Sequence, residues 1–110
     1  ILNDGGDLVL MGFKSEGRGI VVQTISGGSS EVLGGVMCFG KPSSKAFVSE
    51  DSEIRISTTS YGWGATSYYG TGISDTRGEK TTIIRAEDLP LRGFDKLSGA
   101  RQGYLIPLYK

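Results

Sequence analysis

The chain has 110 residues, of which 37% are hydrophobic and 22% are charged, and its 12 basic and 12 acidic side chains give zero formal net charge. This length fits one domain with one modest core, so residues 1–110 are predicted to form a single domain. The balanced charge argues against the broad positive field that attracts nucleic acid or an anionic membrane. We therefore expect neither nucleic acid binding nor membrane insertion.

Short apolar runs separated by turn residues predict a series of β-strands, and the 18 glycines favour many tight turns. The first two runs, residues 8–13 and 19–25, flank the turn residues 15–18 and are predicted to pair as a β-hairpin. Another strand is expected over residues 31–39, with a bulge or sharp bend at the pair Gly34-Gly35.

Two more strands, residues 46–49 and 53–59, are expected on either side of a polar turn at residues 50–52. In the second of these strands Ile54, Ile56 and Thr58 face one way and Arg55, Ser57 and Thr59 face the other. This period of two predicts a sheet with one buried side and one solvent-facing side.

The second half of the chain begins with a long glycine-rich segment, residues 60–78, which is predicted to be a long loop or a bent hairpin. Residues 80–86 form the next predicted strand. Residues 87–91 cannot continue as a central strand because Pro90 lacks an amide donor, so a turn or a short helical turn is expected there. Residues 93–102 are predicted to be an exposed connection.

The last predicted strand, residues 103–109, is strongly apolar, and this predicts that the carboxyl end is held in a core or in a subunit interface. Pro107 implies an edge strand or a bulge. Six to eight short strands of this kind predict an all-β fold, either a compact antiparallel β-sandwich or a partly closed barrel. We find no internal repeat and no long helical pattern in the sequence.

Groups that could support catalysis or bind a metal are few. The chain has no histidine, which excludes Ser/His/Asp and Cys/His arrangements and removes the commonest zinc and copper ligand. The one cysteine, Cys38, has apolar neighbours that predict a packed, inert thiol. We interpret the acidic residues between 50 and 53 and at 87–88 as turn and cap residues, and residues 3–7 as a solvated turn. The domain is therefore expected to be non-enzymatic, with no cofactor and no metal.

One segment combines aromatic side chains with glycine, serine and threonine. The predicted ligand-binding residues are Tyr61, Trp63, Tyr68, Tyr69 and Arg77. Such a composition is typical of contact loops, in which rigid rings supply contact area and small polar residues supply hydrogen bonds. The rings would stack on sugars or on protein side chains, and Arg77 or Arg55 would hold a carboxylate such as that of an acidic sugar. The alternative is that the rings fill the core or a subunit interface.

Two parts of the chain resemble the heads of adenovirus fibres. Residues 7–14 (DLVLMGFK) and 19–27 (GIVVQTISG) are similar to the first two strands of such heads, and residues 103–110 (GYLIPLYK) are similar to their last strand. The Thr-Leu-Trp-Thr motif that begins many fibre heads is absent. Short all-β tips of bacteriophage fibres share this character.

The resemblance implies a homotrimeric attachment domain at the virion surface, formed by the carboxyl-terminal part of a longer fibre protein. Each subunit would be a β-sandwich that binds a host-cell receptor, either a protein or a sialic-acid-type glycan, through its surface loops. Two other functions stay open from the residues alone. One is a monomeric carbohydrate-binding or lectin-like module, and the other is a secreted inhibitor or a structural decoration protein.

Overall fold

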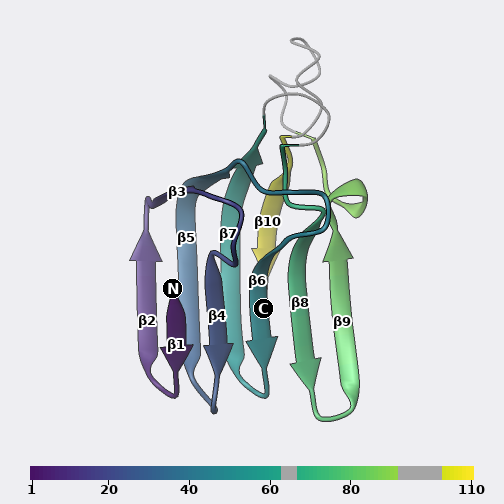
Figure 1. The fold of residues 1–110 in the computed structure, drawn as a ribbon. Coiled ribbons are helices and arrows are strands. Elements are labelled where there is room, and N and C mark those ends of the chain that lie inside the picture. Colours follow the sequence, from purple (N-terminus) through teal and green to yellow (C-terminus); the bar gives the residue numbers. More distant parts are fainter. Residues whose placement is uncertain (63–66, 92–102) are drawn as a thin grey trace.

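The computed structural model describes residues 1–62, 67–91 and 103–110, which form two β-sheets (Figure 1). The described strands are β1 (Leu2–Asp4), β2 (Asp7–Met11), β3 (Lys14–Glu16), β4 (Val22–Ile25), β5 (Ser29–Cys38), β6 (Lys45–Glu50), β7 (Glu53–Tyr61), β8 (Thr71–Arg77), β9 (Lys80–Arg85) and β10 (Leu105–Tyr109). A 3-10 helix, η1 (Ala86–Asp88), follows β9 and confirms the expected short helical turn. The predicted all-β class is also confirmed.

The sheets are built by winding the chain in one direction. The first sheet has the strand order β1-β4-β6-β8-β9, and the second has the order β10-β7-β5-β2, with β3 also paired to β5. All pairings among β1 to β8 are parallel. Each turn of the chain therefore adds one strand to each sheet. We call such a turn a coil: β1 to β3 form the first coil, β4 and β5 the second, and β6 and β7 the third. The architecture is a β-solenoid.

The predicted antiparallel sandwich or barrel is therefore wrong, and so is the predicted hairpin of residues 8–13 with residues 19–25. Strand β2 pairs in parallel with β5, whereas β4 pairs in parallel with β1 and β6 in the other sheet. An alternating pattern fixes which side chains face the core, but it does not fix the partner strand. The short apolar runs were consistent with both topologies for that reason.

The register shows a structural repeat that the sequence conceals. Asn3 pairs with Thr24, Thr24 with Ser49 and Ser49 with Asp75, so successive coils are offset by 21, 25 and 26 residues. All four side chains are buried and form an inward-facing polar row. In the first two coils this row is hydrogen-bonded, because the Asn3 Nδ2 and the Thr24 hydroxyl both donate to the Ser30 hydroxyl, at 2.9 and 2.8 Å. Different residue types and unequal offsets explain why no repeat was found in the sequence.

The core lies between the two sheets and is lined by the inward side chains of both. The buried apolar residues include Val22, Val32, Phe47, Ile54, Ile56 and Ile73. The predicted alternation in β7 is confirmed, with Ile54, Ile56 and Thr58 buried and Arg55 exposed. The predicted bulge is also confirmed, because the register of β5 on β7 shifts between Leu33 and Val36.

The carboxyl-terminal end of the solenoid is closed by strands that run against the others. Strand β9 is antiparallel to β8, and β10 is antiparallel to β7 at the edge of its sheet. The register of β10 shifts between Ile106 and Tyr109, which confirms the irregularity expected around Pro107. Tyr104 and Ile106 are buried, so the carboxyl end is held in the core as predicted.

Candidate ligand-binding site

The connections between strands differ between the two ends of the coils. At one end, which we call the turn end, residues 5–6, 26–28, 51–52 and 78–79 make short links. At the other end, the loop end, the connections are longer, and we call residues 17–21 the first loop, residues 39–44 the second loop and the described residues 67–70 before β8 the third loop. The first two loops lie toward the top of Figure 1. In stacked-coil proteins insertions map to one face, which is often the binding face. The loop end is therefore where a binding site is to be sought.

A hollow of about 420 Å³ lies at the loop end. Its lining residues are Arg18, Gly40, Lys41, Pro42, Ser43 and Ser67. A second hollow of about 180 Å³ adjoins it at Pro42 and is lined by Pro42, Tyr68, Gly70, Arg85, Ala86 and Glu87. We call the two together the loop-end groove. Three cationic side chains and one carboxylate line it, so it favours an anionic ligand.

Tyr69 forms the support beneath this groove. It is 1% exposed, and its hydroxyl lies 3.0 Å from the carbonyl oxygens of both Gly17 and Gly19, which flank Arg18. Burial, together with the nearby Cys38, raises the pKa of the Tyr69 phenol. The phenol therefore stays protonated and can donate to these carbonyls at neutral pH. The Tyr69 side chain, from the segment just before β8, thus holds the loop of residues 17–21 in position.

Close backbone approach fixes the second loop. The Gly70 amide donates to the Lys41 carbonyl at 3.3 Å, and the Thr71 amide donates to the Ser44 carbonyl at 3.2 Å. A Cβ atom at Gly70 would lie 1.8 Å from the Pro42 carbonyl oxygen, so this approach requires glycine. The groove is therefore held in shape before any ligand arrives, which lowers the cost of binding.

A second tyrosine supports the first. The Tyr104 hydroxyl donates to the Tyr69 carbonyl at 3.0 Å, and this hydrogen bond is buried. Burial raises the pKa of Tyr104 far above its ordinary value, so it too remains a donor. The Ser44 hydroxyl adds a link to the first loop by donating to the Arg18 carbonyl at 2.9 Å.

The structure separates the residues predicted to bind ligand. Tyr68 lines the groove and is half-buried, whereas Tyr69 lies beneath it as a support. Tyr61 ends β7 and is half-buried, outside the lining of the groove. Trp63 lies outside the described residues. Arg77 ends β8 at the turn end, whereas Tyr68 and Tyr69 precede the start of β8 at the loop end.

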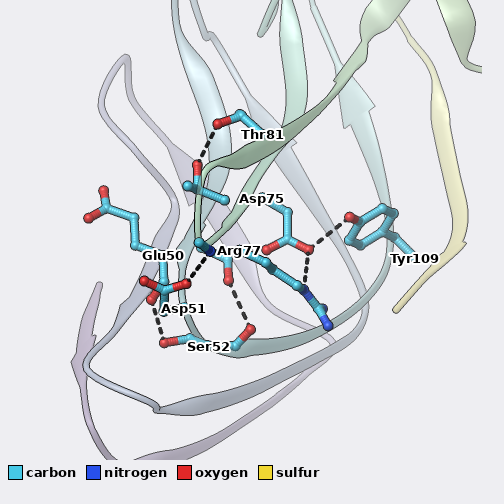
Figure 2. A network of polar contacts seen from close by, with 10 residues as sticks. Glu50, Asp51, Ser52, Asp75, Arg77, Thr81 and Tyr109 are labelled. Carbon is cyan, nitrogen blue, oxygen red and sulfur yellow. Dashed lines mark hydrogen bonds and ion pairs between the residues drawn. The ribbon is translucent and has the colours of Figure 1, made fainter.

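Arg77 belongs to a polar network at the turn end (Figure 2). Its Nε donates to Asp75 Oδ2 at 3.2 Å, and the Tyr109 hydroxyl donates to the same oxygen at 2.9 Å. Asp75 is 3% exposed, and its Oδ1 has no partner among the described residues. Arg77 and Arg55 line one hollow of about 230 Å³ there. The two arginines proposed for a carboxylate therefore line one hollow, at the opposite end of the coils from Tyr68 and Tyr69.

Sequence reasoning missed the cations of the groove, Arg18, Lys41 and Arg85. Each stands in a turn-rich segment or at a strand end, where a charged residue is ordinary. Their convergence depends on the stacking of coils, which places residues more than 20 positions apart side by side. The unequal lengths of the connections would have been the signal, had the repeat been recognised.

Comparison with known protein families, with curated proteins and with solved structures gives no match for this chain. Within the part of the chain that the structure describes, no group of three or more Cys, Asp or Glu side chains is arranged to hold a metal ion. Over the same residues, none of the helices is long and apolar enough to cross a membrane. The loop-end groove is therefore the feature of the molecule that bears on function.

Proposed function

We propose that this domain is a non-catalytic binding module that holds an acidic glycan, such as one ending in a sialic-acid-type sugar, in the loop-end groove. The observation that carries the proposal is the convergence of Arg18 and Lys41 on one hollow that adjoins Tyr68 and Arg85. The volume of about 420 Å³ is within the range of small-molecule sites.

The chemistry of the lining matches the parts of such a sugar. A guanidinium or ammonium group at Arg18 or Lys41 can pair with a carboxylate. The hydroxyls of Ser43 and Ser67 can exchange hydrogen bonds with sugar hydroxyls. The half-buried ring of Tyr68 offers an apolar face to the C–H groups of the ring. A neutral sugar would forgo the charge pairing, so the groove favours the acidic form.

Attachment to a host cell is the setting that we propose for this binding. It is supported by a groove formed from surface loops. The resemblance of residues 7–14, 19–27 and 103–110 to fibre heads is one of short sequence stretches alone, because the β-sandwich that it implied is not the fold of this chain. A virion-surface location and a homotrimer follow only from that resemblance and stay predictions. A monomeric lectin-like module would use the same groove, so the ligand class does not depend on the assembly.

The proposal is tested by titrating sialyllactose and lactose into the full chain in a calorimeter, because the two differ only by the acidic sugar. We expect binding of sialyllactose alone, weakened at high salt. The double variant Arg18→Gln/Lys41→Gln should lose at least about tenfold in affinity, since charge-assisted hydrogen bonds contribute about 1.5–3 kcal/mol each when well formed.

Lys80→Gln is the matched control, because Lys80 is an exposed cation at the turn end. It removes a positive charge without touching the groove and should leave affinity unchanged. Equal binding of lactose and sialyllactose, or equal losses in the two variants, would contradict the proposal.

A further inference from the structure

We infer that the turn end of the solenoid carries a second ligand site, which binds the phosphate group of a sugar phosphate or of a similar polyol phosphate. Two hollows lie there, of about 230 Å³ and about 410 Å³. Arg77 and Glu53 line both of them, so one ligand can extend from the first into the second. We call the smaller one the cationic hollow and the larger one the acidic hollow. This inference is independent of the loop-end groove, which lies at the other end of the coils.

The cationic hollow brings together three positive side chains from three strands. Arg55 lies in β7, Arg77 ends β8, and Lys110 directly follows β10, so both sheets contribute. The Glu53 carboxylate lines the same hollow but forms no salt bridge with any of the three. Within the described part of the chain, Arg55 and Lys110 have no side-chain hydrogen bond either. Their donors are therefore available to the oxygens of a ligand.

The third cation, Arg77, is held in a fixed orientation. Its Nε donates to Asp75 Oδ2 at 3.2 Å, and the Tyr109 hydroxyl fixes that oxygen with a second hydrogen bond of 2.9 Å. Figure 2 shows that the outer end of the guanidinium is directed away from Asp75. No described residue accepts a hydrogen bond from its terminal nitrogens. The outer N–H groups are thus positioned in advance for an oxyanion, which lowers the cost of binding.

The stacked coils provide an internal comparison for the carboxylate that holds Arg77. Asp75 occupies the position of the polar row that Asn3, Thr24 and Ser49 occupy in the coils before it. Those three residues are neutral, so the fold does not require a charge at this position. Burying a carboxylate costs more than burying a neutral polar group, and pairing with an exposed arginine recovers little of that cost. We therefore attribute the carboxylate to the positioning of Arg77.

The number and direction of the donors favour phosphate over a carboxylate. A phosphate monoester carries about 1.5 to 2 negative charges at neutral pH and three strong acceptor oxygens. Donors that converge from the ends of three strands suit such a group, whereas a carboxylate has one charge and two oxygens. The cationic hollow, at about 230 Å³, is smaller than the roughly 300–1,000 Å³ of sites that hold a whole ligand. It therefore fits one charged group of a larger molecule.

The acidic hollow fits the remainder of that molecule. Its lining includes Asp51, Ser52 and Glu53. The Gly78 amide donates to Asp51 Oδ1 at 2.6 Å and fixes this carboxylate, and its other oxygen has no hydrogen bond among the described residues. Carboxylates accept hydrogen bonds, and the hydroxyl groups of a sugar donate them. A phosphate ester with an apolar organic part would leave these acceptors unused, so the two hollows together favour a hydroxyl-rich ester.

The test is an NMR titration of the full chain with glucose 6-phosphate, inorganic phosphate and glucose. We expect glucose 6-phosphate to bind more tightly than inorganic phosphate, and glucose not to bind. The amide shifts should concentrate on residues 51–55 and 76–78 and leave residues 17–21 and 39–44 unchanged. Beads that carry a glycan ending in mannose 6-phosphate show whether the same group is bound on a glycan. Binding of the free ester or of the glycan supports the inference, and binding of neither overturns it.

Arg55→Gln is the decisive variant, because Arg55 is exposed and makes no contact that the fold needs. Its affinity for glucose 6-phosphate should fall at least about tenfold, since a charge-assisted hydrogen bond is lost. Its affinity for sialyllactose should be unchanged, which separates this site from the loop-end groove. Arg77→Lys keeps the charge but loses the planar fork, and it should also bind the ester more weakly.

Lys14→Gln is the matched control, because Lys14 is an exposed cation of β3 that lines neither hollow. It should bind glucose 6-phosphate like the unmodified chain. Equal losses in Arg55→Gln and Lys14→Gln would overturn the inference, and so would amide shifts confined to the loop end. Equal affinities for glucose 6-phosphate and inorganic phosphate would overturn the assignment of a sugar phosphate.

Discussion

Replacing Tyr69 by phenylalanine separates the packing of its ring from the hydrogen bonding of its hydroxyl, because the ring stays and only the hydroxyl is removed. The hydroxyl reaches the Gly17 and Gly19 carbonyls at 3.0 Å and is the hydrogen-bonding link from the third loop to the segment that carries Arg18. The ring that lies against Gly40 stays in place, since a Cβ built at Gly40 would meet ring carbons and the backbone nitrogen of Tyr69 and not the hydroxyl. No cavity is expected.

The two effects of this change should differ in size. Gly17 is partly exposed and Gly19 is exposed, so water can replace the lost donor, and the free energy of unfolding should fall by only about 0.5–1.5 kcal/mol. The freed loop must then be ordered when ligand binds. Ordering one residue costs about 1–2 kcal/mol, so affinity for an acidic glycan should fall by about five- to thirtyfold.

Tyr104→Phe is the comparison variant. Urea unfolding gives the change in stability, and calorimetric titration gives the change in affinity. The Tyr104 hydroxyl of the unmodified chain donates to the Tyr69 carbonyl in a buried position, so leaving this carbonyl without a donor should cost about 1–3 kcal/mol of stability. Its effect on affinity should be smaller than that of Tyr69→Phe, because it does not contact the Arg18 segment. If Tyr69→Phe binds as tightly as the unmodified chain, the first loop is not held by this hydroxyl and our account of the groove is wrong.

Three further predictions concern the groove and the buried phenols. Gly70→Ala should lower the free energy of unfolding by about 1–3 kcal/mol in urea titrations and weaken glycan binding, because its Cβ would lie 1.8 Å from the Pro42 carbonyl oxygen. Gly78→Ala, whose Cβ would meet nothing within 4 Å, should leave glycan binding unchanged. Tyr68→Ala should weaken glycan binding by about two- to tenfold in the calorimeter, since the ring contact contributes about 0.5–1.5 kcal/mol. Tyr68→Phe keeps the ring and should bind as tightly as the unmodified chain. Equal losses of affinity in the two variants would exclude stacking on the ring. The pKa values of Tyr69, Tyr104 and Tyr109 are all raised above 10.0, chiefly by burial, so their stabilisation is complete below pH 10 and is lost as pH rises above it. Urea unfolding with phenolate absorbance across this range should show a steep loss of stability, and a flat profile would show that the phenols titrate freely in the folded chain.

The sequence allowed the faces of strands to be predicted but not their partners. In β7 the alternation of Ile54 and Ile56 with Arg55 determined the buried side correctly, and Gly34-Gly35 and Pro107 correctly marked irregular pairing. The topology was missed because parallel winding joins residues 21 to 26 positions apart, and no local turn signal encodes that distance. A β-hairpin and a coil of the solenoid both need apolar and polar residues to alternate along each strand, so periodicity alone could not distinguish the two.

The candidate groove shows a similar limit of sequence reasoning. The aromatic composition of residues 60–78 led to Tyr68, which does line the groove, and equally to Tyr69, which is buried beneath it. Composition cannot distinguish a ring that faces outward from its neighbour that faces inward. These two tyrosines precede β8 in an irregular segment, so no periodic pattern assigns one of them to the groove and the other to the interior.

The offsets between coils connect the fold to the proposed function. They grow from 21 to 25 and then 26 residues along the stack, while the links at the turn end stay short. The added length is therefore concentrated at the loop end, where residues 39–44 and 67–70 contribute to the groove. A purely structural solenoid has no need for this asymmetry, since short turns satisfy the backbone at lower entropic cost. The combination of loop length with fixed geometry, through Tyr69 and Gly70, is what the proposed binding role requires of these loops.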